Sequence, residues 1–211
     1  MDWLILIIAV ILLGGFLLCL YWRYRSRVTS APCPTWLSWM LEVNFMGKPV
    51  GRSDAVEQLG LAPGMRVADV GCGPGRLTLP IAEAVGAEGE VVALDMQQGM
   101  LDKMMRWTAA AGLRNVRPLL GGAGEGHLPE QYFDRALLST VLGEIPDRER
   151  ALSEIARALK PNGFLLVVEV LGDPHYQFKS KVLELADRVG LKPGDYYPKW
   201  YGYAIRLYRV N

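Results

Sequence analysis

The residues best suited to contact a small molecule are three alternating glycines that follow an acid. The apolar run Val67–Val70 contains Asp69, and Gly71, Gly73 and Gly75 come directly after it. Glycine has no Cβ atom and adopts positive φ angles freely, so such residues form tight strand-to-helix turns. We therefore expect a strand that ends in a turn whose main chain a ligand can contact directly.

A second acid follows the next apolar run, at the position where an adenosine-type ligand would be bound through its ribose. The apolar run Val91–Leu94 ends in Asp95, twenty residues after Gly75. At that spacing an acid at the tip of the second strand accepts hydrogen bonds from ribose hydroxyls. The dinucleotide fingerprint G-x-G-x-x-G, counted from Gly71, would require glycine where this chain has Arg76. The pattern thus indicates an adenosine-type ligand and argues against a nicotinamide or flavin.

The pattern D-x-G-x-G-x-G at residues 69–75 resembles motif I of the class I S-adenosylmethionine-dependent methyltransferases. Three later segments resemble further motifs of that family, especially of its ubiquinone and menaquinone methyltransferase branch: Asp95–Gln97, Gly121–Ala123 and Phe133–Gly163. The resemblance implies S-adenosyl-L-methionine as cofactor and S-adenosyl-L-homocysteine as product. It also implies an α/β fold with a Rossmann-like seven-stranded sheet, mostly parallel, that closes with a C-terminal antiparallel hairpin.

By this resemblance, the acid before the glycines faces the amino end of the cofactor, and the glycines pass beneath its methionine part. The predicted cofactor-binding residues are Asp69, Gly71, Cys72, Gly73, Gly75, Asp95, Met96, Gly122, Ala123 and Ser139. One departure concerns adenine, because the branch often has aspartate where this chain has Gly122. Glu125 is the candidate to replace that acid. Cys72 itself is expected to be a small buried packing residue without chemistry.

Two side chains are candidates for proton transfer. Methyl transfer from a sulfonium is an in-line displacement, and it requires a general base only where the acceptor is still protonated. His175 follows the fifth predicted strand and is either that base or a surface histidine without a role. Glu144 follows the fourth strand, where helix capping and cofactor support are the alternatives. The tetrapeptide D/N-P-P-Y of enzymes that methylate nucleic-acid amines is replaced there by Ser139–Leu142.

Charge and cysteine content argue against two further classes of protein. The 23 basic and 22 acidic residues give a net charge of +1, which provides no electrostatic footprint for nucleic acid. Three scattered cysteines, Cys19, Cys33 and Cys72, suit neither a disulfide framework nor a zinc site. We therefore predict no nucleic-acid partner and no metal.

The N-terminal segment Trp3–Trp22 contains no charged residue. As a helix it would be about 30 Å long, which matches the hydrocarbon core of a bilayer. Arg23, Arg25 and Arg27 follow at once, so the positive-inside rule places the C-terminal domain in the cytoplasm. We predict one transmembrane helix in a single-pass membrane protein. A cleaved signal peptide is the alternative, although Asp2 stands where such peptides carry basic residues.

The chain divides into three predicted parts. They are an anchor with its basic flank at 1–27, a membrane-proximal amphipathic segment at 28–52, and the cofactor-binding methyltransferase domain at 53–211. In the second part, Trp36, Trp39 and Met40 share one helical face, which packs on the domain or forms a substrate entrance at the membrane. In the third part helices and strands alternate, which predicts a parallel sheet covered on both faces.

The predicted strands are 65–70, 90–94, 116–120, 134–139, 164–170, 195–200 and 203–210, and the predicted helices are 53–60, 76–85, 98–111, 148–159 and 179–189. An anchor on a small methyltransferase favours an acceptor that partitions into the bilayer, such as a quinone-type or other lipid, or a small lipophilic thiol. The alternative is a membrane-tethered scaffold protein that binds S-adenosylmethionine without turnover.

Overall fold

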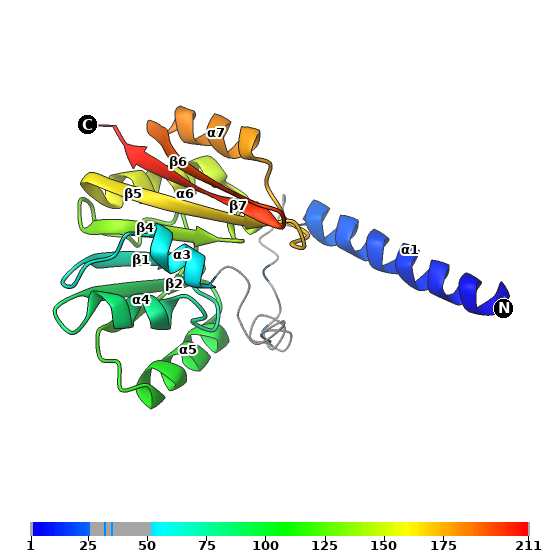
Figure 1. Cartoon of the computed structure of the whole chain (residues 1–211), viewed down its shortest axis with the longest axis horizontal. Coiled ribbons are helices and arrows are strands. Elements are labelled where there is room, and N and C mark those ends of the chain that lie inside the picture. The colour runs from blue at the N-terminus through cyan, green and yellow to red at the C-terminus, as the bar shows by residue number, and fades with distance from the viewer. Residues whose placement is uncertain (1, 26–31, 33–34, 36–51, 211) are drawn as a thin grey trace.

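The computed structural model describes residues 2–25, 32, 35 and 52–210 of the 211-residue chain. The predicted amphipathic face of Trp36, Trp39 and Met40 lies outside the described residues. Figure 1 shows a layered α/β domain from which one long helix projects.

Seven strands form one sheet in the order β3-β2-β1-β4-β5-β7-β6. Their bounds are β1 Arg66–Val70, β2 Glu90–Asp95, β3 Val116–Leu120, β4 Phe133–Ser139, β5 Leu159–Val170, β6 Leu191–Lys199 and β7 Gly202–Arg209. Strands β1 to β5 pair in parallel, whereas β7 runs antiparallel to both β5 and β6. The predicted Rossmann-like sheet with its antiparallel C-terminal hairpin is confirmed.

Helices cover both faces of this sheet, as the alternation of elements predicted. They are α3 Arg52–Gln58, α4 Thr78–Val85, α5 Gln98–Ala110, α6 Arg148–Ala158 and α7 Lys179–Arg188. On one face, α3, α4 and α5 bury Ala55, Ile81 and Met104 against the sheet. On the other face, α6 and α7 bury Ile155 and Leu185. Because both faces are covered, the central strands β1 and β2 are almost continuously apolar and buried.

Two strands begin earlier than predicted. β5 starts at Leu159 and includes Lys160–Gly163 as an irregularity in its pairing with β4, with Asn162 at φ 65°. Asparagine tolerates this left-handed conformation because its side chain is short and polar. β6 starts at Leu191, and its register against β7 shifts after Pro193. Proline is depleted from strands, so the first half of β6 does not look like a strand in the sequence.

Helix α1, Asp2–Arg25, meets the domain at the edge where the parallel strands end (Figure 1). Within its segment Trp3–Arg25, an 18-residue window has a mean hydropathy of 3.0, and the segment is long and apolar enough to cross a membrane, by length and composition alone. The last turn of α1 is tied to the loop after β5. There the Arg23 guanidinium donates hydrogen bonds to the carbonyls of Pro174 and Tyr176, at 2.8 and 3.2 Å. The carboxyl edge of the sheet is therefore also the edge that carries the apolar helix.

Candidate active site

The glycine turn joins β1 to α4 at the carboxyl edge of the sheet. Gly71, Gly73 and Gly75 all have positive φ angles, of 72°, 54° and 91°. A Cβ atom on Gly71 would lie 2.5 Å from Val141 Cγ2, and one on Gly75 would lie 2.6 Å from Met104 Cγ. A Cβ on Gly73 would meet no atom of the described residues within 4 Å. Gly71 and Gly75 are thus constrained by protein packing, and Gly73 is the glycine whose missing side chain leaves open space for a ligand.

Asp95 connects the tip of β2 to this turn. Its Oδ2 accepts a hydrogen bond from the Gly73 amide at 2.9 Å, and its Oδ1 accepts one from the Gln97 amide at 2.9 Å. Burial raises the pKa of the Asp95 carboxyl, while these two amide donors act in the opposite direction. Each carboxylate oxygen has more than one lone pair, so the side chain retains acceptor capacity toward a ligand.

Asp69 is buried in β1 beneath the turn. The Thr78 hydroxyl, in the first turn of α4, donates a hydrogen bond of 2.6 Å to Asp69 Oδ2. Burial raises the pKa of Asp69 to about 6, against the opposing effect of the Thr78 bond. Asp69 is therefore mostly ionised at neutral pH, and it provides a buried negative charge at the end of the site.

Glu125 lies beside the glycine that departs from the family pattern. Its Oε2 accepts a hydrogen bond from the Gly122 amide at 2.9 Å, and His127 Nε2 lies 3.1 Å from the same oxygen. These contacts, with the Gly122 amide as the largest, lower the pKa of Glu125. An ionised carboxylate is thus present three residues beyond Gly122, on the turn that follows β3.

A cavity of about 780 Å³ brings these elements together. Nine of the ten predicted cofactor-binding residues line it: Asp69, Gly71, Cys72, Gly73, Asp95, Met96, Gly122, Ala123 and Ser139. Gly75 does not line the cavity, because its Cα faces Met104 of α5 instead. The volume lies in the upper part of the range of about 300–1,000 Å³ that is typical of small-molecule sites. Glu125, Glu144 and His175 also line it.

Glu144 and His175 form a buried acid–base pair at the cavity. Glu144 ends the short 3₁₀ helix Leu142–Glu144, and its Oε1 lies 3.6 Å from His175 Nδ1. Asp173 Oδ1 lies 3.7 Å from the same nitrogen and accepts the His175 backbone amide at 2.6 Å. Neither ring nitrogen of His175 makes a hydrogen bond of ordinary geometry with any described residue. Both ring nitrogens are buried, and the Trp22 main chain favours the protonated ring, so the imidazole is positioned by its surroundings.

Burial sets the protonation of this pair. It raises the pKa of Glu144 to about 8, with Asp173 adding to the effect, and it lowers the pKa of His175. At neutral pH the imidazole is therefore neutral and able to accept a proton. Two of the alternative roles that the sequence left open for these residues are wrong. His175 is 2% exposed, so it is no surface histidine, and the N-cap of α6 is Asp147 rather than Glu144.

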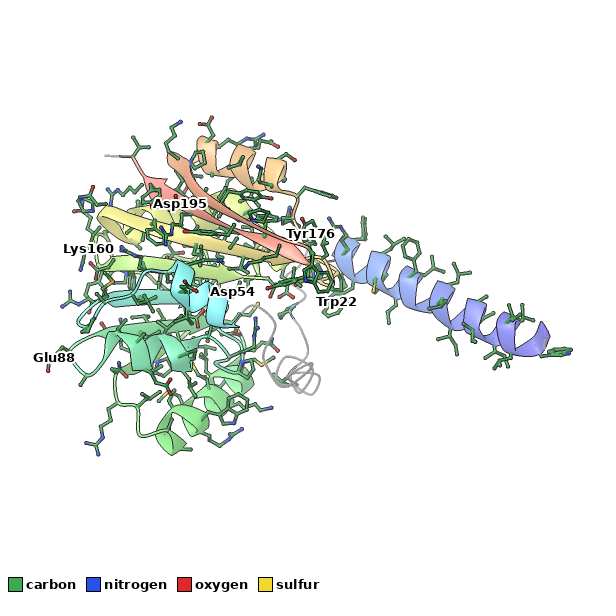
Figure 2. The ribbon with its side chains drawn as sticks, in the orientation of Figure 1. Trp22, Asp54, Glu88, Lys160, Tyr176 and Asp195 are labelled. Carbon is green, nitrogen blue, oxygen red and sulfur yellow. The ribbon has the colours of Figure 1, made fainter. Side chains whose placement is uncertain are left out.

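The last turns of α1 contribute to the cavity, which sequence reasoning missed. Cys19 and Trp22 both line it, and the Trp22 ring packs edge-on against His175 with 5.1 Å between ring centroids. Figure 2 shows Trp22 and Tyr176 at the junction between α1 and the domain. In the sequence, Trp22 was identified only as the last residue of the uncharged segment Trp3–Trp22. Its contact with a loop 150 residues away depends on the fold.

Comparison with known proteins agrees with this geometry. Residues 67–163 match the sequence family described as a methyltransferase domain. These residues therefore form a methyltransferase domain. The chain is 34% identical over 129 residues to the demethylmenaquinone methyltransferase of Geobacillus stearothermophilus. It is 33% identical over 127 residues to the enzyme of that name from Staphylococcus aureus.

These two alignments cover 61% and 60% of this chain, and 55% and 52% of the relatives. The chain thus spans about half the length of the curated relatives it matches. Among solved structures, the methyltransferase domain superposes on a SAM-dependent methyltransferase from Aquifex aeolicus with a TM-score of 0.69, at 21% identity, over 88% of this chain and 97% of that one.

It also superposes on a phosphoethanolamine N-methyltransferase from Haemonchus contortus that was solved with S-adenosylhomocysteine. That match has a TM-score of 0.63 at 21% identity, and it covers 75% of this chain and 41% of the other. At these identities the structural matches support the fold of the methyltransferase domain.

Proposed function

We propose that the protein transfers the methyl group of S-adenosylmethionine to a quinol-type lipophilic acceptor at a membrane. The observation that carries the proposal is a single cavity with three kinds of wall. One wall is the glycine turn with Asp69 and Asp95, the second is the Glu144–His175 pair, and the third is the end of the apolar helix α1. In this proposal the cofactor site, the proton acceptor and the lipid-facing helix would share one space.

We assign the cofactor to the part of the cavity formed by β1, β2 and β3. The ionised Asp69 carboxylate would accept a hydrogen bond from the cofactor's ammonium group, and the methionine part would lie over the Gly73 main chain. Asp95 would accept hydrogen bonds from the ribose hydroxyls. Glu125, held by the Gly122 amide, would accept the adenine amino group in place of the aspartate that the family often has at that point.

The reaction then needs the acceptor held in line with the sulfonium methyl group, which the shape of the cavity would provide. His175 would accept the proton of a quinol hydroxyl, and the resulting anion would form the bond to the methyl carbon through its adjacent ring carbon, while the sulfur–methyl bond breaks and leaves its electrons on sulfur. That ring carbon would then lose its proton and the oxygen would regain one, which restores the aromatic quinol and leaves S-adenosylhomocysteine. The Asp173 carboxyl group flanks the imidazole and would stabilise its protonated form.

The apolar helix defines where this reaction would occur. We propose that α1 spans the bilayer as a single anchor, with Arg23 and Arg25 in its last turn on the cytoplasmic side. The names of the curated relatives, which are demethylmenaquinone methyltransferases, support a quinone-type acceptor with an apolar tail. Such a molecule partitions into lipid, so an anchor concentrates the enzyme beside it.

The test is methyl transfer by the full chain reconstituted in phospholipid vesicles. The cofactor would carry a radiolabelled methyl group, and the acceptor would be a reduced demethylated naphthoquinone with a prenyl tail. We expect label in the lipid fraction, and we expect His175→Gln to lower kcat about 100-fold at pH 7. Activity of the variant should recover as the pH rises, because the acceptor then loses its own proton to water.

S-adenosylhomocysteine affinity, measured on the same His175→Gln preparation, is the control and should be unchanged. Full activity in the variant would refute the role of His175. Tight cofactor binding with no methyl transfer to naphthoquinol or to a lipophilic thiol would instead support the scaffold alternative.

A further inference from the structure

Three exposed apolar side chains lie close together at the carboxyl edge of the domain. Leu171 is 58% exposed, Phe178 67% and Trp200 90%. They come from three different segments, which are the loop after β5, the residue before α7 and the turn between β6 and β7. Single exposed apolar residues are common on soluble proteins, but convergence of large ones from separate segments marks a contact surface.

The sheet itself brings these segments together. Val170 at the end of β5 and Lys199 at the end of β6 both pair with Gly202 at the start of β7. The Leu171 amide donates a hydrogen bond to the Tyr201 carbonyl at 2.8 Å, which fixes the loop after β5 against the β6–β7 turn.

Phe178 is joined to the same surface through aromatic contacts. The Tyr176 ring lies 5.4 Å from the Phe178 ring and 6.0 Å from the Tyr203 ring, measured between centroids. We call Leu171, Phe178 and Trp200 together the apolar rim.

The turn between β6 and β7 lies on the side of the domain from which α1 projects (Figure 1), and Tyr176, in the loop after β5, is drawn beside the end of α1 (Figure 2). Arg23, in the last turn of α1, donates hydrogen bonds to the carbonyls of Pro174 and Tyr176, in the loop that connects Leu171 to Phe178. A basic residue at the end of an apolar helix marks the level of the membrane interface. The loop between two rim residues is thus bonded to the part of α1 expected at that level.

We propose that the apolar rim inserts into the surface of the bilayer and holds the carboxyl edge of the domain against the lipid. The proposal rests on the proposed function only in taking α1 as a membrane-spanning helix. Tryptophan and phenylalanine suit this level of the membrane, where an apolar ring contacts acyl chains at their boundary with the head groups.

This orientation has a consequence for the site. Trp22 of α1 and Pro174 and His175 of the rim loop all line the cavity. With the rim in the lipid, this part of the cavity faces the bilayer surface. A lipophilic acceptor would then enter the cavity directly from the lipid phase, with its reactive group arriving beside His175.

The experiment is photochemical cross-linking of the full chain in vesicles of phosphatidylcholine and phosphatidylglycerol that contain a fluorescent phospholipid. Benzoylphenylalanine would replace Phe178 or Trp200 in separate proteins. The matched control replaces Val210, which is 49% exposed and follows the end of β7 at the opposite edge of the sheet. All three proteins keep α1, so anchoring is equal among them.

We expect lipid adducts at positions 178 and 200 in at least fivefold higher yield than at position 210. Equal yields at all three positions, or adducts to protein instead of lipid at 178 and 200, would overturn the proposal. Benzoylphenylalanine at Leu171 provides an independent third position if one replacement impairs folding. S-adenosylhomocysteine titration of the same proteins tests the proposed function separately, because cofactor binding does not require the rim to touch lipid.

Discussion

Alanine at Gly73 should prevent cofactor binding without unfolding the protein. Gly73 lines the cavity, has φ 54°, and would direct a Cβ atom into space with no atom of the described part of the chain within 4 Å. Gly64 offers a matched control. It lies before β1 at the opposite edge of the sheet, has φ 82°, and likewise has nothing within 4 Å of an added Cβ. Gly73→Ala and Gly64→Ala therefore differ mainly in whether the new methyl group faces the proposed ligand.

The expected sizes follow from this difference. A left-handed conformation costs an alanine about 1–2 kcal/mol, so both variants should lose that much free energy of unfolding. If the cofactor lies in van der Waals contact with the Gly73 main chain, an intruding methyl group acts as overpacking and costs about 1–3 kcal/mol of binding. That corresponds to a dissociation constant about 5-fold to 150-fold higher for Gly73→Ala, and to no change for Gly64→Ala.

The assay is denaturant unfolding of each variant, followed by calorimetric titration with S-adenosylhomocysteine. Equal losses of stability, together with weakened binding in Gly73→Ala alone, would support the placement of the cofactor on the turn. Affinities that agree within a factor of two would refute it, because the Cβ atom at Gly73 has no other neighbour among the described residues.

Two further predictions concern buried titratable groups. Burial raises the pKa of Glu169 in β5 to about 8, and its Oε1 has no hydrogen-bond partner among the described residues. Its neutral form thus favours the folded state, and the free energy of unfolding should fall as the pH rises from about 4.5 toward 8. At about 1.4 kcal/mol per pKa unit, this loss of unfolding free energy amounts to roughly 3–5 kcal/mol. Urea unfolding of Glu169→Gln should no longer show the loss, and an unchanged pH profile in the variant would contradict the prediction. Removal of the Thr78 hydroxyl in Thr78→Val should raise the pKa of Asp69 further above about 6. S-adenosylhomocysteine should then bind several-fold more weakly at pH 6.5 and recover by pH 8, and a pH-independent loss would argue against a charge contact between Asp69 and the cofactor.

Much of the fold was predictable because local patterns and tertiary packing agree. The strands β1, β2, β3 and β4 were recognisable as short runs rich in apolar residues, and the predicted helices between them were found close to their predicted bounds. The start of β6 was missed because it contains Pro193 and Gly194, which are uncommon inside strands. Only its pairing with β7 makes this segment a strand.

The site was predictable where a motif carries it and unpredictable where distant segments meet. The pattern of glycines and acids located the turn and Asp95. It led us, however, to explain all three glycines in the same way, as residues over which a ligand lies. Gly75 depends on Met104, which no local pattern indicates. Trp22 and His175 lie far apart in the sequence, and their ring contact follows only from the way α1 docks on the loop after β5.

The central claim is that the cavity binds an S-adenosyl cofactor through Asp95 and the glycine turn. Its most direct test is isothermal titration of the detergent-solubilised full chain with S-adenosylhomocysteine, with Asp95→Ala as the variant and NAD as the control ligand. We predict saturable binding by the unmodified chain, binding at least about tenfold weaker in the variant, and none of NAD. No binding of S-adenosylhomocysteine, or a preference for NAD, would contradict the account.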